Sequence, residues 1–422
     1  MLIHDNISIV LCHITKNESI RKLRNVSKKF NMCMTENLKF YYKVNDTSDY
    51  VPKYIVGLEF YDTFNNSVDD LPDNVTRLNF GSMFNQSVDN LPKRVTHLTF
   101  LNSFNRLVDK LPKNITHLTF GRWFDQSVDN LPNSITHLTF GHDFDQSVDN
   151  LPNSITHLTF GYWFNQSVDN LPNNVTHLTF GYCFNRPVDK LPNSITHLNF
   201  GCRFNQPIDN LPNSITHLHF DGDYRCNFHH KLPNNITHLT FSSNSCNRVC
   251  ELPKSITNLK FTYKGRGSEP VDDLPNCTTH LTFGDEFNKS VDNLPDSITH
   301  LEFGYMFNSF VDNLPNSITH LTFGFWFNRS VDNLPNSITH LEFGYMFNSF
   351  VDNLPNSITH LTFGGNFNCS INKLPNSITH LIFNGKHKLK KTDRLPKKIK
   401  YLEIGGKIIK SKVINKYIKN NK

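Results

Sequence analysis

A repeat period of 20 residues constrains this chain more than any other feature. Leu-Pro pairs return at this spacing from Pro72 to Pro212 and, after an irregular stretch, again from Pro275 to Pro375. With the weaker Val51-Pro52 pair, the chain holds eighteen such units. Residues 297–324 are identical to residues 337–364, which indicates that two units were duplicated together. A fixed period of this length predicts one elongated body of stacked units, since each unit contacts only its neighbours.

Each unit carries the pattern of one short β-strand. We number a unit from Ile155 as position 1 to Asn174 as position 20, so that its apolar residues occupy positions 1, 4, 6, 10, 14 and 17. The alternation at positions 4 and 6, among β-branched and aromatic residues, predicts a strand over positions 1 to 6. Gly at position 7 and the Asp-Asn-Leu-Pro segment predict turns. We expect parallel strands about 4.8 Å apart, with Phe filling the interior, because 30 of the 36 Phe lie at positions 6 or 10.

Two of the copies resemble a known repeat. LPNSITHLTFGYWFNQSVDN and LPNSITHLNFGCRFNQPIDN are similar to the FNIP repeat, named for a Phe-Asn-Ile-Pro core, and residues 204–208 come close to that core. The FNIP family is regarded as similar to leucine-rich repeats. The resemblance implies a leucine-rich-repeat-like solenoid over residues 51–404, with a curved parallel β-sheet and one short strand per unit. The chain departs from leucine-rich repeats in having Phe at position 10 and Asn at position 11, instead of Asn at position 9.

Histidine occupies position 3 in fourteen units. In a coil of this kind, positions 2, 3 and 5 face the concave sheet surface as rows of Thr, His and Thr. A metal or acid–base site needs unlike partners around one particular His, whereas every His in this row has the same neighbours. Like charges stacked about 5 Å apart repel, so we predict that most rings are neutral near pH 7 and bond along the row or to Thr. The row is therefore interpreted as scaffold.

No motif in the chain indicates an enzyme. Catalysis needs unlike groups that converge at one place, but the repeated carboxylates at position 15 are copies of one turn residue. The chain has no nucleophile elbow, phosphate-binding loop or metalloprotease motif. We therefore predict a non-enzymatic protein.

The copies differ most at positions 8 and 9, which hold all three tryptophans. Aromatic residues, Met and Arg anchor protein interfaces, and a turn beside the sheet would expose them. The competing interpretation is that unconstrained positions drift in sequence, or that a ring such as Trp163 only covers a neighbouring Phe. The sequence predicts partner binding through Arg122, Trp123, Tyr162, Trp163, Tyr305, Met306, Phe325 and Trp326.

Residues 212–275 interrupt the regular period with units of 21 and 22 residues. Cysteine and histidine gather here, at Cys226, His229, Cys246 and Cys250, where adjacent coils could bring them together. Zinc favours such ligands, but their spacing matches no strong zinc signature. We predict no metal and no cofactor, and zinc binding at these four residues is the alternative.

The first fifty residues carry no repeat. Apolar residues at helical spacing predict two short amphipathic helices in this segment. The stretch LIHDNISIVLCHI and the later VSKKF resemble an F-box, although Ile3 stands where that family has Pro. The resemblance implies docking onto the adaptor of a cullin–RING ubiquitin ligase, so that residues 1–45 hold the ligase and the solenoid holds the target. The alternative is an N-terminal cap without a ligase link. The F-box-like contact residues are Leu2, Ile7, Leu11, Ile14, Val26 and Phe30.

Positive charge is concentrated at the C-terminus. The formal charge of +6 divides into +12 over residues 386–422 and −6 over residues 1–385. A nucleic-acid surface needs clustered Lys and Arg, so only this tail offers one, and we favour a polar cap over residues 405–422 instead. The nine scattered cysteines and the lack of an export signal or a long apolar stretch predict an intracellular, cytoplasmic protein that spans no membrane, with a nuclear location through the tail as the alternative.

Overall fold

The computed structural model describes residues 41–44, 56–221, 232–242, 252–262, 274–390, 392–409 and 414. The regular secondary structure of this part consists of short β-strands joined by turns. The chain divides into two units, residues 1–195 and 196–422, which we call the N-terminal unit and the C-terminal unit. The predicted helices and the six F-box-like residues lie outside the described residues.

The strands of the N-terminal unit form a parallel sheet in which each strand pairs with the next in the sequence. Successive strands are aligned without a shift, so that Leu98 pairs with Leu118 and His97 with His117. β1 belongs to the same sheet, which therefore begins before residue 51, inside the segment for which helices were predicted. The strands are β1 (Tyr41–Val44), β2 (Gly57–Phe60), β3 (Arg77–Asn79), β4 (His97–Thr99), β5 (His117–Thr119), β6 (His137–Thr139), β7 (His157–Thr159) and β8 (His177–Thr179).

The C-terminal unit repeats this arrangement and ends in a hairpin. β20 pairs antiparallel with β19, and the turn between them contains Gly405 and Gly406, whose φ angles are 57° and 77°. Positive φ at both residues is what a tight hairpin turn requires. The strands are β9 (His197–Phe200), β10 (His217–Phe220), β11 (His238–Phe241), β12 (Asn258–Phe261), β13 (His280–Thr282), β14 (His300–Glu302), β15 (His320–Thr322), β16 (His340–Glu342), β17 (His360–Phe363), β18 (His380–Phe383), β19 (Tyr401–Ile404) and β20 (Lys407–Ile408).

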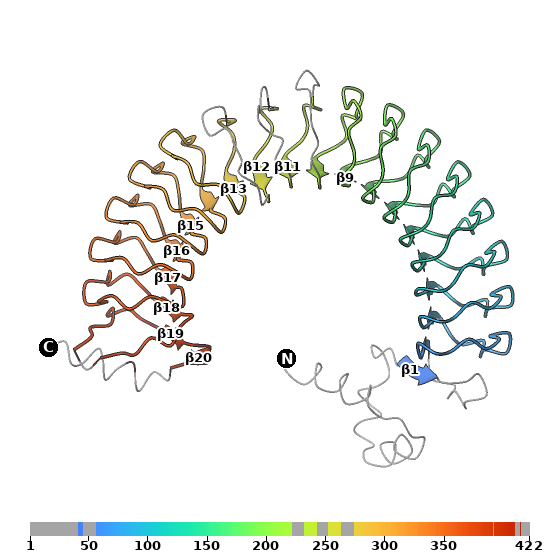
Figure 1. The fold of residues 1–422 in the computed structure, drawn as a ribbon, viewed down its shortest axis with the longest axis horizontal. Coiled ribbons are helices and arrows are strands. Elements are labelled where there is room, and N and C mark those ends of the chain that lie inside the picture. Colours follow the sequence, from blue (N-terminus) through green and yellow to red (C-terminus); the bar gives the residue numbers. More distant parts are fainter. Residues whose placement is uncertain are drawn as a thin grey trace, which may run out of the picture. The chain divides into compact units, whose positions relative to one another are not determined.

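The apolar positions predicted from the repeat form the core of every regular coil. In the coil that begins at Ile155, positions 1, 4, 6, 10, 14 and 17 are all buried. Within one coil the rings of Phe160 and Phe164 stack with centroids 3.8 Å apart. Between coils, the centroid spacing grows from 4.2 Å at His157 and His177 to 6.1 Å at Phe164 and Phe184. The coils therefore fan outward from the strands, and Figure 1 shows the strands on the inner side of each unit.

Glycine at position 7 is explained by the close packing of coils. A Cβ atom on Gly161 would overlap the carbonyl oxygen of Gly141, and one on Gly324 would overlap that of Gly304. Of the described glycines, those with positive φ are Gly405 and Gly406 alone, so the backbone angle is not the reason at position 7. The turn predicted there depends on the approach of two backbones, which a side chain would obstruct.

Polar side chains join neighbouring coils on the outer surface. At position 11, the side-chain oxygen of Asn85 accepts a hydrogen bond from the backbone N–H of Asn105, at 3.0 Å. The same bond links Asn328 to Asn348 in the C-terminal unit, at 2.8 Å. An asparagine ladder therefore exists in this chain at position 11, two residues later than in leucine-rich repeats. It satisfies backbone donors that the short strands leave unpaired.

Candidate interaction surface

Side chains at positions 8 and 9 project from the coils in rows. The backbone N–H of position 9 donates to the carbonyl oxygen of position 8 one coil earlier, as from Trp163 to His142 and from Trp326 to Tyr305, both at 2.9 Å. Position 10 is buried, so positions 8 and 9 are held at the surface. We call residues 122–123, 142–143, 162–163 and 182 the N-terminal ridge, and residues 305–306, 325–326 and 345–346 the C-terminal ridge.

The N-terminal ridge contains a stack of three rings with a tryptophan against it. Tyr162 stacks on His142 with centroids 4.8 Å apart and on Tyr182 at 4.6 Å. Trp163 stands edge-on to Tyr162, at 5.0 Å and an interplanar angle of 72°. Trp163 is 47% exposed and Trp123, two coils earlier, is 52% exposed. The rings are thus fixed by one another while much of their surface faces solvent.

The C-terminal ridge builds the same arrangement from different residues. Phe325 stacks on Tyr305 with centroids 4.6 Å apart and on Tyr345 at 5.1 Å. Trp326 stands edge-on to Phe325, at 5.5 Å and 68°, and is 44% exposed. Met306 is exposed beside it. Each unit therefore presents three stacked rings and one perpendicular tryptophan.

The structure places the eight sequence-predicted binding residues on these two ridges, four on each. Sequence reasoning did not count His142, Tyr182 and Tyr345 among the binding residues, although these three complete the two ring stacks. Their signal was present, because all three occupy position 8, but stacking between coils cannot be read from one copy. It also missed Phe310 and Phe350 at position 13, which are exposed on the outer surface.

The histidines at position 3 stack ring on ring, with neighbouring centroids 4.1 to 4.3 Å apart. As predicted, the rings bond to Thr: Nδ1 of His137 lies 2.9 Å from Oγ1 of Thr136. That Oγ1 donates its hydrogen to the carbonyl oxygen of Thr116, at 3.1 Å. Since a hydroxyl has one hydrogen, Nδ1 must donate to Oγ1. The bond places the ring hydrogen on Nδ1 and leaves Nε2 as the acceptor of the neutral ring.

Burial lowers the pKa of several of these rings below 6.5, and positive charge on neighbouring histidines of the row lowers it further. For His117 the neighbouring charges are those of Arg77 and His157. Both causes favour the neutral ring. All fourteen histidines have the same Thr partner, so the row gives a uniform face. The rungs with a lowered pKa are His117, His137, His238, His300, His320, His340 and His360.

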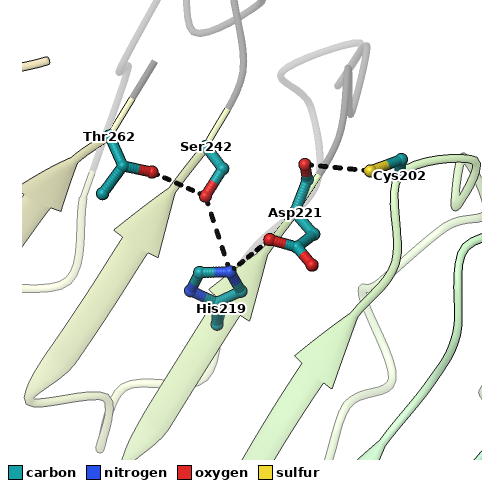
Figure 2. A network of polar contacts seen from close by, with 5 residues as sticks. All are labelled: Cys202, His219, Asp221, Ser242 and Thr262. Atoms are coloured by element: carbon teal, nitrogen blue, oxygen red, sulfur yellow. Dashed lines mark hydrogen bonds and ion pairs between the residues drawn. The ribbon is translucent and has the colours of Figure 1, made fainter. Parts of the chain in front are cut away.

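The irregular coils contain a network of unlike polar groups (Figure 2). Nε2 of His219 lies 2.9 Å from a carboxylate oxygen of Asp221 and 3.5 Å from Oγ of Ser242. Oγ1 of Thr262 donates to Ser242 at 2.7 Å, and the Cys202 thiol donates to the Asp221 carbonyl at 3.2 Å. In a catalytic triad the carboxylate and the hydroxyl bond to different ring nitrogens, whereas here both approach Nε2. The network therefore lacks the geometry of an activated serine.

This network exists because position 7 is not glycine in three successive coils. Asp221, Ser242 and Thr262 stand there, and their backbone N–H groups donate to the Phe carbonyl at position 6 one coil earlier, at 2.8 to 2.9 Å. The strands preceding them extend to position 6, whereas the strand of a typical regular coil ends at position 5. In these three coils the backbone N–H of position 7 bonds to the coil before, and the position carries a side chain.

Two predictions concern residues that the structure covers only in part. The alternative zinc ligands Cys226, His229, Cys246 and Cys250 lie outside the described residues. Among the residues that are described, no group of three or more His, Cys, Asp or Glu could hold a metal ion. A search of the same residues finds no helix with the length and apolar character needed to cross a membrane.

Comparison with known families identifies the repeat. The FNIP repeat matches the chain in overlapping segments, from residues 64–103 through 204–244 and from 270–306 through 371–407. The chain belongs to the FNIP repeat family. No curated protein sequence matches it.

Solved structures that resemble this FNIP repeat chain include CroV588 and a YopM protein. The first, described as CroV588, a novel circular leucine-rich-repeat protein, is 39% identical with a TM-score of 0.62. That match covers 87% of this chain and 65% of CroV588, so the chain spans about two thirds of that protein. YopM from Yersinia enterocolitica WA-314 is 18% identical, with a TM-score of 0.47 and coverage of 84% of this chain and 83% of YopM. The first match shows the leucine-rich-repeat-like solenoid that the sequence predicted.

Proposed function

We propose that this FNIP repeat chain is a scaffold that binds other proteins through its two ridges. The observation that carries the proposal is the exposure of aromatic rings at positions 8 and 9, where the copies differ, while the apolar positions that the copies share are buried. Tyr, Trp and Met are the residue types that anchor protein interfaces. Because the rings are already stacked, binding would cost little side-chain entropy.

Proximity labelling in the native cell tests the proposal. The intact chain is compared with a variant carrying Trp163→Ser and Trp326→Ser, one change on each ridge. Serine already occupies position 9 at Ser103, so the fold accepts it. We expect specific labelled proteins to be lost with the ridge variant. Leu107→Ser, which removes an exposed apolar side chain outside both ridges, is the matched control and should leave labelling unchanged. Equal loss with both variants, or no loss with either, would contradict the proposal.

The proposal assigns no catalytic step to the chain, because the repeat fold supplies copies of one environment rather than unlike groups at one place. The His219 network is the described exception, and its geometry does not activate Ser242. We place the function in the cytoplasm, which agrees with the free thiols of the four described cysteines. A binding role then rests on surface shape and residue type alone.

A specialised form of this function is that of a substrate receptor in a cullin–RING ubiquitin ligase. Its only support is the F-box-like spacing of residues 1–45, with Leu2, Ile7, Leu11, Ile14, Val26 and Phe30 as the adaptor contacts. In this proposal the ridges hold the target and the N-terminal segment holds the adaptor. The competing proposal is a binding protein without a ligase link.

Deleting residues 1–40 separates the two proposals, because this deletion spares β1 and its pairing with β2. The receptor proposal expects co-purification of the adaptor and the cullin to be lost while ridge-dependent labelling persists. Unchanged co-purification, or none from the intact chain, would remove the ligase link. Ridge-dependent labelling in both forms would still support the binding function.

A further inference from the structure

The asparagine ladder changes to aspartate at two rungs, and both lie beneath the N-terminal ridge. Asp125 and Asp145 stand at position 11. The Asp125 carboxylate accepts the backbone N–H of Asp145 at 2.9 Å, and the Asp145 carboxylate accepts that of Asn165 at 2.8 Å. Asn makes the same bond at the neighbouring rungs, as Asn105 does to Asp125 at 3.1 Å. The carboxylates therefore add negative charge that the ladder does not need.

The same coils place a third carboxylate between two tryptophans. Trp123, Asp143 and Trp163 occupy position 9 on three consecutive coils, held by backbone bonds to position 8 of the coil before, at 2.8 to 2.9 Å. Rings of neighbouring coils lie 4.8 Å apart at position 8 and 6.1 Å apart at position 10, so the two tryptophans are about 10 to 12 Å apart with Asp143 between them. Positions 9 and 11 flank the buried Phe144, so the carboxylates of Asp143 and Asp145 both lie toward the surface.

An arginine and a histidine belong to the same region. Arg122 is exposed at position 8, and the His142 ring contacts the Asp143 carboxylate through Nδ1. Three carboxylates therefore face one permanent cation here. The faces of two half-exposed indole rings add negative potential, since aromatic faces attract cations. Electrostatic attraction at this place favours a positively charged group.

We propose that the N-terminal ridge binds a segment of a partner protein that carries Arg or Lys, with the cationic group entering between Trp123 and Trp163 above Asp143. A guanidinium fits this place best, because it stacks on aromatic rings and bonds to carboxylates at the same time. This inference rests on the proposed binding function and specifies the chemistry of one of its partners.

The C-terminal ridge is the internal comparison. It has the same three-ring stack and perpendicular tryptophan, but Met306 and Met346 flank Trp326 at position 9, and asparagines stand below them at position 11. Around this ridge, carboxylates occupy positions 8 and 9 only in the coil before it, at Asp285 and Glu286. Selectivity for a cationic group should therefore belong to the N-terminal ridge.

Tryptophan fluorescence measures each ridge separately, because the chain has only three tryptophans. In Trp326→Phe the signal comes from the N-terminal ridge alone, and in Trp123→Phe with Trp163→Phe it comes from the C-terminal ridge. The probe is a capped octapeptide of alternating Arg and Ser, with Gln in place of Arg as the neutral control. We expect saturable binding at the N-terminal ridge at least tenfold tighter for the Arg peptide, weakening with salt, and no such preference at the C-terminal ridge.

A charge-neutral variant completes the test. It carries Asp125→Asn, Asp143→Asn and Asp145→Asn in the Trp326→Phe background. The changes at positions 125 and 145 restore the usual residue of the asparagine ladder. We expect this variant to bind the Arg peptide at least tenfold more weakly. Equal binding of the Arg and Gln peptides, or unchanged binding by the charge-neutral variant, would overturn the inference. Either result would leave the binding function intact if the variant with Trp163→Ser and Trp326→Ser still loses labelled partners, whereas partners retained by that double variant would end the binding proposal itself.

Discussion

The sheet face and the ridges of this chain lie a few residues apart in every unit and differ in kind. On the sheet face, each His at position 3 has the same Thr partner, and the rings of neighbouring coils stack at nearly the same distance. On the ridges, neighbouring coils carry residues as different as Arg122, His142 and Tyr162 at one position. Stacking requires sameness, because every rung must fit the one before it. The difference indicates that the repeated residues build the fold and the variable ones can serve binding.

The largest expected effect comes from opening the core below a ridge. Phe164→Ala removes a fully buried ring that stacks on Phe160 and should lower the free energy of unfolding by about 3 to 5 kcal/mol. Trp163→Ala, one residue away but half exposed, should cost about 1 kcal/mol or less. Urea denaturation of both variants measures the contrast. Similar losses would mean that the ridge is part of the core.

A smaller loss is expected at the glycine that separates the strand from the ridge. Gly161→Ala places a Cβ against the carbonyl oxygen of Gly141 and should cost about 1 to 3 kcal/mol. Thr262→Ala at the same position of an irregular coil should cost less than about 1 kcal/mol, because that position already carries an exposed side chain there. Thermal unfolding of the two variants checks this, and equal costs would remove the packing explanation.

Acid should weaken the sheet face before it affects the ridges. The lowered pKa of rungs such as His300 and His340 means that the unfolded chain takes up protons near pH 6.5 while the folded chain does not. Stability is therefore greatest above about pH 6.5 and falls as the pH drops below it toward the folded-state pKa. The melting temperature should fall modestly between pH 7.5 and 5.5. An NMR titration that gave most of the position-3 histidines a pKa above 6.5 would contradict the prediction that these rings are neutral.

The smallest effect on stability is expected for a single rung. His340→Asn puts at this position the residue that the chain already carries at Asn258, whose side chain bonds to Thr257 at 2.8 Å. The loss of ring stacking should cost about 1 kcal/mol or less. A larger loss in the free energy of unfolding, measured by urea denaturation, would show that the histidine row stabilises the sheet more than its half-buried position suggests.

The sequence predicted the fold well because each coil obeys one pattern. Positions such as Ile155, Leu158 and Phe164 could be assigned to the core from spacing alone, and His137 to a Thr-bonded row. The reason for Gly161 could not be found this way, because the overlap with Gly141 exists only between coils. The ring stacks of Tyr162 with His142 and Tyr182 were missed for the same reason.

The irregular coils show a second limit of sequence reasoning. Spacing drew attention to Cys226, His229, Cys246 and Cys250, whereas the described contacts involve His219 and Asp221. These two residues look like ordinary drift at positions 5 and 7 when one copy is read alone. Their contact with Ser242 joins side chains of neighbouring coils, which the period of the repeat does not reveal.

One measurement tests the division between scaffold and binding surface most directly. Proximity labelling compares two variants of the same coils. The ridge variant carries Tyr305→Ser, Trp326→Ser and Tyr345→Ser, and the histidine variant carries His300→Asn, His320→Asn and His340→Asn. Circular dichroism must first show that both variants are folded. We predict that the ridge variant loses labelled partners and that the histidine variant keeps them. Loss of partners with the folded histidine variant, and their retention with the ridge variant, would contradict the account.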